Sequence, residues 1–440
     1  MFTDLKPYPE YADSGRKELP PIPHSWRVRR LKSVCRFSYG NALPDEKRDP
    51  GSVLVMGSNG PIGHHSAVNT WGETIVIGRK GSFGKVHYSS VPVFVMDTAY
   101  FVDRRSSAAI IEWLAAALRW LPLDQNSRDS AVPGLDREEA HGYFVPYPPL
   151  EEQAAIVKYL GHANARIDRA IAAKRKLIAL LDEQKQAIIN QAVTRGLDPN
   201  VPMKDSGIPW LGPIPAPWQV ARIKDAFRCL NALRVPLSSE QRGAMVSRQF
   251  DYYGASGVID KVDNYLFDEP LILLAEDGAN LVSRNLPLAI LARGRYWVNN
   301  HAHILRPKSG SVEFLAHRLE LVDYRPWISG AAQPKLTRDR FMSIPIAVPP
   351  LEEQNSIVAF LKSEAAPSDF VISRANREIE LLREFRTRLT ADVVTGQLDV
   401  REAAARLPEL DPDDLVSDDV GTDEQDLDTE LAENLEEVDA

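Results

Sequence analysis

Cysteine is scarce in this chain of 440 residues, and long apolar runs are absent. Cys35 and Cys229 are the two cysteines, too few for a disulfide framework or a cysteine-rich zinc site, so we expect a cytoplasmic, reducing environment. Without a run of 18 apolar residues we expect no membrane-spanning helix, and the N-terminus lacks the apolar stretch of a secretory signal. Hydrophobic residues still make up 44% of the chain, which excludes a wholly disordered protein.

Basic residues are missing from the end of the chain. From Pro408 onward there are 15 acidic residues and no basic ones, and we expect this tail to be disordered. The whole chain has 61 acidic and 52 basic residues, so residues 1–407 hold 46 acidic and 52 basic residues, a net charge of +6. The folded part is therefore mildly basic, which is compatible with nucleic-acid binding without requiring it.

No complete catalytic motif is present in the sequence. Residues 79–86 imitate part of a kinase glycine-rich loop, but the other kinase motifs are missing, and Val86 after Lys85 breaks the P-loop pattern. His301 and His303 could place two imidazoles on one strand face, but no carboxylate or cysteine partner is near in the sequence. A half-buried strand pair is therefore favoured over a metal site, and the sequence predicts a non-catalytic chain.

The chain repeats itself with an offset of about 200 residues. The sequence Asp-Ser-Gly occurs at residues 13–15 and 205–207, and Pro-Pro-Leu-Glu-Glu-Gln occurs at 148–153 and 349–354. These edges agree while the residues between them diverge. The pattern indicates two copies of one scaffold that carry different recognition surfaces.

The divergent middles predict a mixed α/β fold in each half. Short β-branched or apolar runs bounded by glycine, proline or asparagine predict strands at residues 53–56, 74–77, 93–96, 271–274 and 288–291. Residues 107–118 and 312–321 read as helices. Gly81 and Gly278 follow equivalent strands and mark turns.

Both Pro-Pro-Leu-Glu-Glu-Gln motifs introduce a long helix. Proline suits a first helical turn, and the glutamates favour the helix N-terminus. A heptad seam follows in each half, formed by residues 157, 160, 164, 167, 171, 174, 178, 181, 185, 188 and 192, and by residues 358, 361, 365, 368, 372, 375, 379, 382, 386, 389 and 393. We expect two helices of roughly 70 Å that pair as an antiparallel coiled coil about a pseudo-twofold axis. Pro367 predicts a kink or break in the second helix.

This duplicated organisation resembles the specificity subunit of type I restriction-modification enzymes. The resemblance rests on the Asp-Ser-Gly entry, the Pro-Pro-Leu-Glu-Glu-Gln motif and the long helix of each half, and on residues 297–303 (Trp-Val-Asn-Asn-His-Ala-His). It implies target recognition domains at 11–148 and 218–348, conserved long helices at 149–198 and 349–400, a linker at 199–217 and an acidic tail at 401–440.

The resemblance also implies a function. The expected protein is a non-catalytic specificity subunit that reads a bipartite, asymmetric site in double-stranded DNA, with the helices setting the spacer. Two methyltransferase subunits and the motor-nuclease restriction subunits are the expected partners, in a phage-defence system. S-adenosylmethionine, ATP and magnesium are expected in those partners and not in this chain. The alternatives are a subunit of a methyltransferase-only system and a coiled-coil scaffold that does not bind DNA.

Candidate contact residues come from the diverging loops and the long helices. For DNA binding we select Lys80, Ser82, Lys85, Ser130 and Arg137 in the first half and Asp277, Asn280, Gln333, Lys335 and Arg338 in the second. Basic residues suit guanine edges or phosphates, whereas Asp or Asn suits cytosine or adenine. For partner docking and spacing we select Leu150, Ile156, Leu160, Ile167, Leu181, Leu351, Ile357, Leu361, Ile379 and Leu382.

Overall fold

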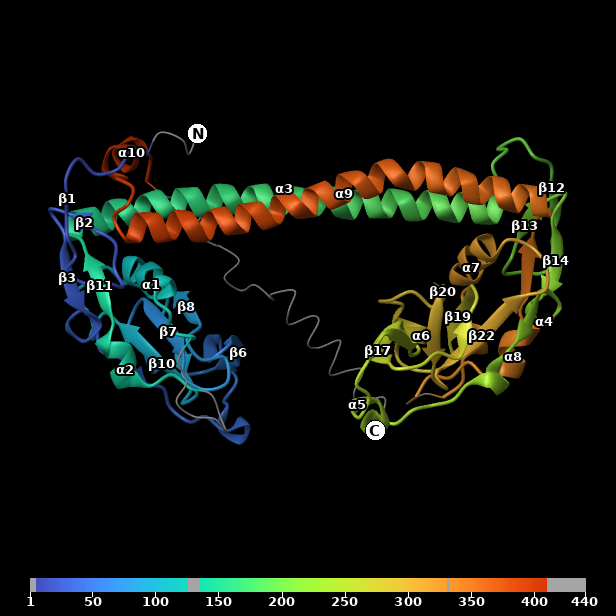
Figure 1. The fold of residues 1–440 in the computed structure, drawn as a ribbon, viewed down its shortest axis with the longest axis horizontal. Helices are drawn as coiled ribbons and strands as arrows, with labels where there is room; N and C mark the ends of the chain where they lie inside the picture. The colour runs from blue at the N-terminus through green and yellow to red at the C-terminus, as the bar shows by residue number, and fades with distance from the viewer. Residues whose placement is uncertain (1–4, 126–133, 331–332, 410–440) are drawn as a thin grey trace. The chain divides into compact units, whose positions relative to one another are not determined.

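The computed structural model describes residues 5–125, 134–330 and 333–409. The chain divides into unit 1, Met1–Lys176 with Ala375–Asp423, and unit 2, Leu177–Arg374 with Glu424–Ala440. Each unit contains one α/β domain and one part of each long helix, α3 (Leu150–Arg195) and α9 (Leu351–Val394) (Figure 1). No helix among these described residues is long and apolar enough to cross a membrane.

The α/β domain of unit 1 is built around a four-stranded sheet in the order β4-β10-β7-β8, with a second sheet in the order β6-β5-β9. All strand pairs in these two sheets are antiparallel except β5 with β9. The elements of the domain are β1 (Tyr11–Ala12), β2 (Ile22–Pro23), β3 (Arg27–Arg30), β4 (Ser38–Tyr39), β5 (Val53–Gly57), β6 (Gly60–His65), β7 (Thr74–Gly78), β8 (Val86–Ser89), β9 (Phe94–Val95), β10 (Ala99–Asp103), α1 (Ile111–Trp120), α2 (Arg137–Gly142) and β11 (Phe144–Tyr147).

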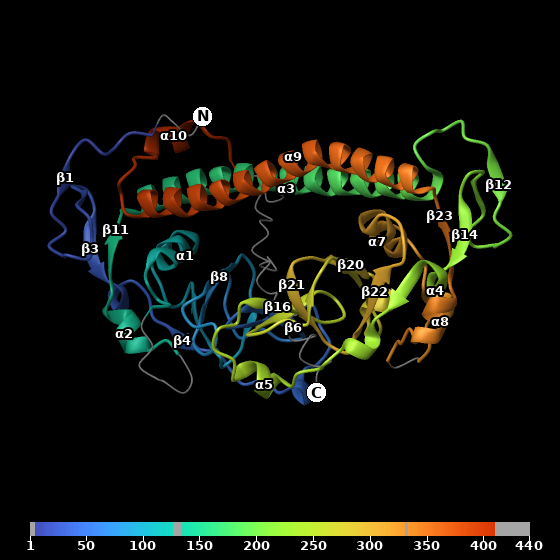
Figure 2. The ribbon, with the colours of Figure 1, turned by 45° about the vertical axis from the view of Figure 1, so that its right-hand side comes forward.

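The α/β domain of unit 2 repeats this plan. Its main sheet has the order β15-β22-β19-β20, and its second sheet has the order β17-β16-β21-β18 with β16 and β21 parallel. Helix α7 lies against β19 and β20 (Figure 2). The elements are β12 (Met203–Asp205), β13 (Pro213–Pro215), β14 (Gln219–Arg222), α4 (Ile223–Ala226), β15 (Phe227–Cys229), α5 (Ser239–Gly243), β16 (Phe250–Tyr253), β17 (Val258–Val262), β18 (Phe267–Asp268), β19 (Leu271–Ala275), α6 (Asn280–Ser283), β20 (Ala289–Ala292), β21 (Arg295–Val298), β22 (Ala302–Pro307), α7 (Val312–Glu320), α8 (Arg338–Ser343) and β23 (Pro345–Val348).

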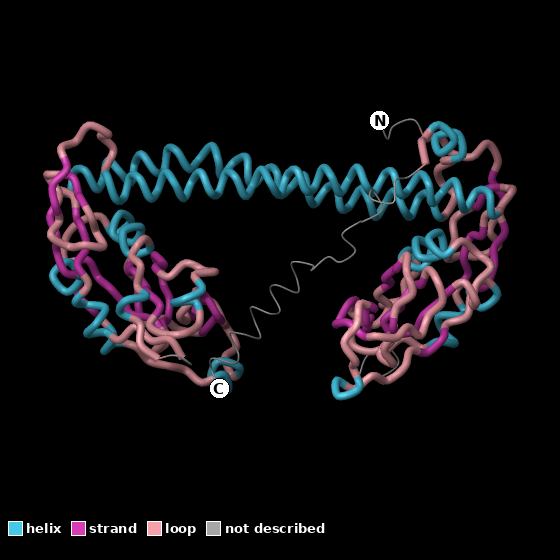
Figure 3. The backbone as a smooth tube through the Cα atoms, turned by 180° about the vertical axis from the view of Figure 1, so that it is seen from behind, coloured by secondary structure: helices cyan, strands magenta, loops and turns pink. Residues whose placement is uncertain are grey.

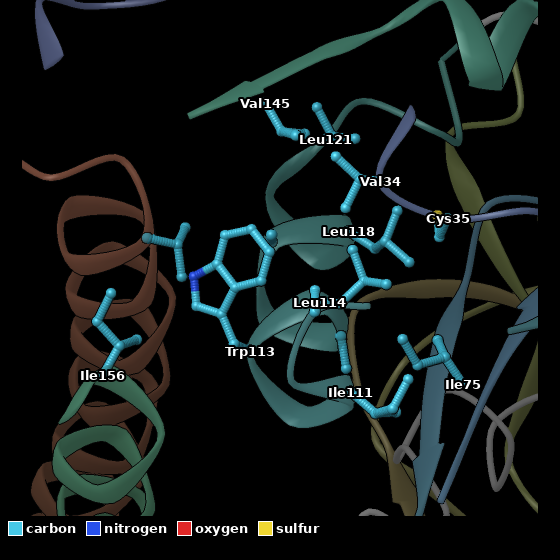
Figure 4. Close-up of a cluster of buried hydrophobic side chains, with 14 of the residues drawn as sticks. Val34, Cys35, Ile75, Ile111, Trp113, Leu114, Leu118, Leu121, Val145 and Ile156 are labelled. Atoms are coloured by element: carbon cyan, nitrogen blue, oxygen red, sulfur yellow. The ribbon is translucent and has the colours of Figure 1, made fainter. Parts of the chain in front are cut away.

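The predicted mixed α/β fold is confirmed, and the central strands of the main sheets show why these residues form it. All five residues of β7 and of β19 are buried, as expected for apolar runs covered on both faces. In unit 1, β7 packs under α1, whose Trp113 points toward Ile156 of α3 (Figure 4). Burying side chains of this size contributes about 1.5–3 kcal/mol each, so the domain and its end of α3 share one core.

Helix α1 starts later than the sequence predicts. The expected start was residue 107, but Ser107 forms a β-bridge with Cys35 and its hydroxyl donates to the Val34 carbonyl at 3.0 Å. The helix begins at Ile111 instead. Tertiary pairing has kept the preceding residues extended, an effect that local sequence cannot reveal.

The glutamine of the repeated motif attaches each domain to its long helix. Gln153 accepts a hydrogen bond from the Ile110 amide at 3.0 Å and donates to the Pro148 carbonyl at 2.9 Å. Gln354 does the same with the Ser311 amide and the Pro349 carbonyl, both at 2.9 Å. Both glutamines are buried, so the motif has a structural role in both units.

The long helices pack antiparallel in each unit, and strands are confined to the α/β domains (Figure 3). The predicted heptad seam is confirmed, because its positions on both helices are the less exposed ones while their neighbours face solvent. The basic residues at three seam positions form ion pairs with the other long helix: Arg386 with Asp168 and Lys174 with Glu378 in unit 1, and Lys185 with Asp369 in unit 2.

Of the kink or break predicted at Pro367, the break is wrong, since α9 is continuous through this residue. Proline removes one backbone donor from the helix interior. Pro367 lies on the exposed side of α9, where the unpaired carbonyl of the preceding turn can bond water. The seam on the other side holds the helix together.

The start of the expected disordered tail also needs correction. Residues 401–406 form helix α10 (Arg401–Arg406), and Val400 and Ala404 are buried in the core of unit 1. Glu409 pairs with Lys158 at 2.7 Å. The acidic tail therefore begins after this helix, and residues 410–440 lie outside the described part of the chain.

Candidate nucleic-acid interface

In unit 1, two segments that are far apart in sequence meet beside the end of β7. Lys80 forms a β-bridge with Gly134, and the Leu135 amide donates to the Arg79 carbonyl at 2.9 Å. Arg137, the first residue of α2, follows directly. The structure therefore brings the candidates Lys80 and Arg137 to one surface.

The turn after β7 presents the other candidates of this half. Gly81 and Gly84 have φ of +71° and +78°, the left-handed region in which glycine is favoured. Lys80 and Lys85 are exposed, Ser82 is half-buried, and the Lys85 ammonium donates to the Asn59 side chain at 2.6 Å. The candidate Ser130 lies outside the described residues.

Tyr39 stands at the centre of this surface, and sequence reasoning missed it. The guanidinium carbons of Arg79 and Arg137 lie 5.1 and 5.2 Å from the centroid of its ring, which is half exposed. We call Tyr39, Arg79 and Arg137 the Tyr39 cluster. Guanidinium groups over an exposed aromatic ring combine positive charge with a stacking face, a combination suited to phosphates and bases. Arg79 adjoins the selected Lys80, but no motif marks Tyr39.

Unit 2 builds the same backbone junction. Asp277 forms a β-bridge with Lys335, and the Leu336 amide donates to the Glu276 carbonyl at 2.7 Å. Arg338 is the first residue of α8, as Arg137 is of α2. By position after the central strand, Glu276 and Asp277 are the counterparts of Arg79 and Lys80.

At this second junction the two residues after the central strand are acidic and largely buried, whereas their counterparts in unit 1 are basic. Glu276 binds Arg234 at 2.6 Å and lies 3.5 Å from the Lys335 ammonium. Asp277 contacts His301 at 2.8 Å. The side chains of the two acids are only 12% and 10% exposed, so both carboxylates are already engaged within unit 2. We call these five residues the Glu276 network.

The remaining candidates of the second half separate into two groups. Asn280 uses its amide to hold the Leu286 backbone, donating at 3.1 Å and accepting at 2.9 Å, so it pins a loop. Gln333, Lys335 and Arg338 are exposed. They follow Gly330, whose φ is +88° and where a Cβ would collide with the Gln333 carbonyl oxygen.

The fold brings carboxylates that are distant in the sequence to both histidines. His301 contacts Asp277, and His303 lies 3.5 Å from Glu276. His303 is nevertheless occupied, because one ring nitrogen lies 2.8 Å from the Leu336 carbonyl and the other 2.9 Å from the Asn231 amide. Burial lowers the pKa of His303. No group of three or more metal-ligating side chains occurs in residues 5–125, 134–330 and 333–409.

The residues of the long helices that were selected for partner docking and spacing differ in their exposure to solvent. Ile156, Leu160, Ile167, Ile357, Leu361 and Ile379 are buried, and Leu181 and Leu382 are half-buried in the seam. The six buried side chains support the fold, whereas Leu181 and Leu382 keep part of their surface accessible. Leu150 and Leu351, the first residues of the two long helices, are 55% and 54% exposed.

Comparison with known proteins identifies the family to which this chain belongs. Residues 23–179 and 215–380 match the family described as "Type I restriction modification DNA specificity domain". The chain belongs to this family. Each match contains one α/β domain and the first part of the long helix that follows it, so the resemblance read from the repeated motif is confirmed.

Two curated relatives carry the name of the same subunit. A putative type I restriction enzyme specificity subunit of Haemophilus influenzae is 34% identical over 146 residues, 33% of this chain and 36% of the relative. The MjaVIII specificity subunit of Methanocaldococcus jannaschii is 23% identical over 306 residues, 63% of this chain and 68% of the relative. The chain thus spans about a third of the first relative and two thirds of the second.

A solved structure supports the fold. It is described as the structural basis of complex assembly and conformational transition of the type I R-M system. It aligns with a TM-score of 0.58 at 14% identity, covering 86% of this chain and 99% of that chain. At this identity the likeness concerns the fold, namely two mixed α/β domains with two long helices packed antiparallel.

Proposed function

We propose that this chain is the DNA-reading specificity subunit of a type I restriction-modification complex, and that each unit reads one half of a bipartite, asymmetric site in double-stranded DNA. One observation carries the proposal beyond family membership: the same backbone junction presents the Tyr39 cluster in unit 1 and the Glu276 network in unit 2. Two copies that read the same half-site would have no reason to differ in charge at equivalent positions.

The exposed cations of each unit suit the electrostatic part of DNA binding. In unit 1 Lys80 is exposed, and the half-buried Arg79 and Arg137 lie over the Tyr39 ring. In unit 2 Lys335 and Arg338 are exposed. Cations of this kind neutralise phosphates and orient the protein, while a few side chains read base edges. In this proposal the continuous helices α3 and α9, and not base contacts, fix the spacer.

Exposed apolar residues on the long helices support docking of the methyltransferase subunits. In unit 2 they are Leu177 and Leu180 of α3, three residues apart and so on one helix face, and Phe370 and Val371 of α9. Unit 1 exposes Leu381 and Phe385 of α9. Catalysis, with S-adenosylmethionine, ATP and magnesium, belongs to the partner subunits in this proposal.

Docking can be tested with Phe370→Asp. Phe370 is 69% exposed, so the change should leave folding intact and reduce co-purification of the methyltransferase subunit. The matched control is Val246→Asp, because Val246 is 92% exposed and lies off the long helices. Equal co-purification for both variants would argue against docking at this surface.

The DNA-reading role is tested by mapping N6-methyladenine across the host genome with and without the gene. Loss of one motif made of two short half-sites around a fixed spacer is the expected result. Exchange of residues 33–147 should then alter one half of that motif only. Unchanged methylation, in a strain that expresses the methyltransferase partner, would refute the proposal and favour the scaffold. Methylation of the motif without cleavage of unmodified DNA would indicate a methyltransferase-only system.

A further inference from the structure

One residue of each central sheet links the reading surface to the strands beneath it. Tyr100 on β10 pairs in register with Ile77 of β7, and His303 on β22 pairs in register with Leu274 of β19. Ile77 and Leu274 each lie one residue before the end of their strand. Tyr100 and His303 therefore occupy the same site in the two domains.

In unit 1 the Tyr100 hydroxyl donates a hydrogen bond to the Leu135 carbonyl at 3.2 Å. Burial raises the pKa of Tyr100 to about 12, so the hydroxyl is protonated at neutral pH. The ring also lies 5.1 Å from the Tyr39 ring and 5.8 Å from the Arg79 guanidinium carbon. Tyr100 thus connects the segment that leads to Arg137 with the other two members of the Tyr39 cluster.

In unit 2 the imidazole of His303 makes the equivalent contact. Its Nε2 lies 2.8 Å from the Leu336 carbonyl, which accepts only if Nε2 carries the proton. Nδ1 then accepts from the Asn231 amide at 2.9 Å. The ring is fully buried and stacks on Phe341 with an interplanar angle of 4°. His303 thus holds the segment that leads to Arg338.

From this pair of contacts we infer that Tyr100 and His303 are positioning residues for half-site recognition. Each fixes the carbonyl of the leucine that lies two residues before a candidate DNA-contacting arginine. Two chemically different side chains, a phenol and an imidazole, make the same bond to the same backbone position. Both leucines are buried, so each carbonyl needs a donor, and each domain supplies it from the same position of its sheet. The inference rests on the proposed function, because it assigns each residue to one half-site.

The test uses the complete complex with its methyltransferase subunits and a duplex library randomised around the methylated motif. Relative methylation rates of single-mismatch sites give the discrimination at each half. Tyr100→Phe removes the hydroxyl and keeps the ring. It should reduce discrimination at the half-site of unit 1 by roughly three- to tenfold, the range of one lost hydrogen bond, and leave the other half-site unchanged. His303→Phe should do the reverse.

Two controls separate positioning from general loosening. Tyr88→Phe removes another half-buried hydroxyl of unit 1, which donates to Glu112 at 3.0 Å on the side of α1, and should leave both half-sites unchanged. His303→Gln keeps an N–H donor and should restore part of the discrimination lost in His303→Phe. Since each variant carries an unaffected half-site, a folding defect would show as equal loss at both.

Three outcomes would overturn the inference. Tyr100→Phe and His303→Phe could discriminate as the wild type does, they could relax both half-sites equally, or Tyr88→Phe could match Tyr100→Phe. Each of these would leave the proposed function standing if the wild-type complex methylates a split motif. A wild-type complex without a split motif would remove the proposed function itself.

Discussion

Units 1 and 2 share one backbone frame and differ in where they place charge. After the central strand, unit 1 has the half-buried Arg79, which lies over the Tyr39 ring, and the exposed Lys80. At the same positions unit 2 has Glu276 and Asp277, whose largely buried carboxylates are engaged in the Glu276 network. The β-bridge and the amide-to-carbonyl bond that join the two recognition segments are the same in both. Backbone hydrogen bonds are indifferent to side-chain identity, so the frame tolerates a reversal of charge.

The comparison also shows how each unit supports its surface. In unit 1 Lys80 is exposed and the half-buried Arg79 and Arg137 lie over a ring that is itself half exposed, so water still screens these cations and their contribution to stability is small. In unit 2, removing one member of the Glu276 network would leave its charged partner unpaired in a site shielded from water. The same position should therefore affect DNA binding in one unit and folding in the other.

The largest effect on stability is expected when Glu276, which supports folding, is compared with Arg79, which is proposed to bind DNA. Glu276→Ala leaves Arg234, whose side chain is 17% exposed, without its carboxylate, and should lower the free energy of unfolding by about 3 kcal/mol. Arg79→Ala should cost less than about 1 kcal/mol and weaken DNA binding with a reduced salt dependence. Urea denaturation and DNA titration at several salt concentrations measure these quantities. Equal destabilisation by the two variants would contradict the comparison.

The tryptophans that follow β2 and β13 offer a second contrast. In unit 1 the Trp26 indole donates to Glu152 at 2.7 Å. In unit 2 the equivalent indole nitrogen of Trp218 is buried without an acceptor among the described residues. Replacing either tryptophan by phenylalanine removes a similar volume. Trp26→Phe should therefore lower the free energy of unfolding by about 1.5–3 kcal/mol more than Trp218→Phe does, which is the range for a hydrogen bond to a charged group. Equal thermal-denaturation shifts would show that this bond contributes nothing net.

Acid should act more strongly on unit 2. Burial lowers the pKa of His303 and His317 in unit 2 and of His141 in unit 1. The unfolded chain then binds protons that the folded chain does not, so stability is full above about pH 6.5 and falls as the pH drops below it. His317→Gln should flatten the fall in unfolding free energy between pH 7 and pH 5, measured by urea denaturation. A steeper fall in the variant would reverse the assigned sign.

The smallest effects are expected at the ion pairs of the long helices. Lys185 and Asp369 in unit 2 lie 2.5 Å apart with the carboxylate 56% exposed, so Asp369→Asn should cost about 0.5 kcal/mol or less. Asp168, which pairs with Arg386 in unit 1, is only 23% exposed, and Asp168→Asn should cost more. Chemical denaturation at low and high salt measures both, and the difference should shrink at high salt.

Much of the architecture could be predicted from periodicity and repetition. The seam positions of α3 and α9, the apolar runs of β7 and β19, and the duplicated motif each express a repeating physical requirement along the chain. Local errors arose where a tertiary contact overrode local preference. Ser107 is held in a β-bridge, Pro367 is tolerated on an exposed helix face, and α10 is buried by its apolar side.

The candidate site was only partly predictable. The sequence marks Lys80 and Arg137, and Asp277 and Lys335, as separate candidates. A β-bridge joins Asp277 to Lys335 directly, and the bridge from Lys80 to Gly134 brings the segment that leads to Arg137 beside Lys80. Tyr39 and Arg234 were missed because neither lies in a motif or a repeated block. Their importance comes from neighbours more than 35 residues away in the chain, and sequence spacing gives no signal for such contacts.

The amino-acid sequence by itself determined the duplication, the family, the mixed α/β class and the antiparallel pairing of two long helices, because each follows from regular patterns of apolar and repeated residues. Only the tertiary structure decided which charged side chains are exposed and which are engaged. That outcome depends on strand register, which places Tyr100 under the Tyr39 cluster and His303 beside the Glu276 network. Register is a property of paired strands, so no single stretch of sequence contains it.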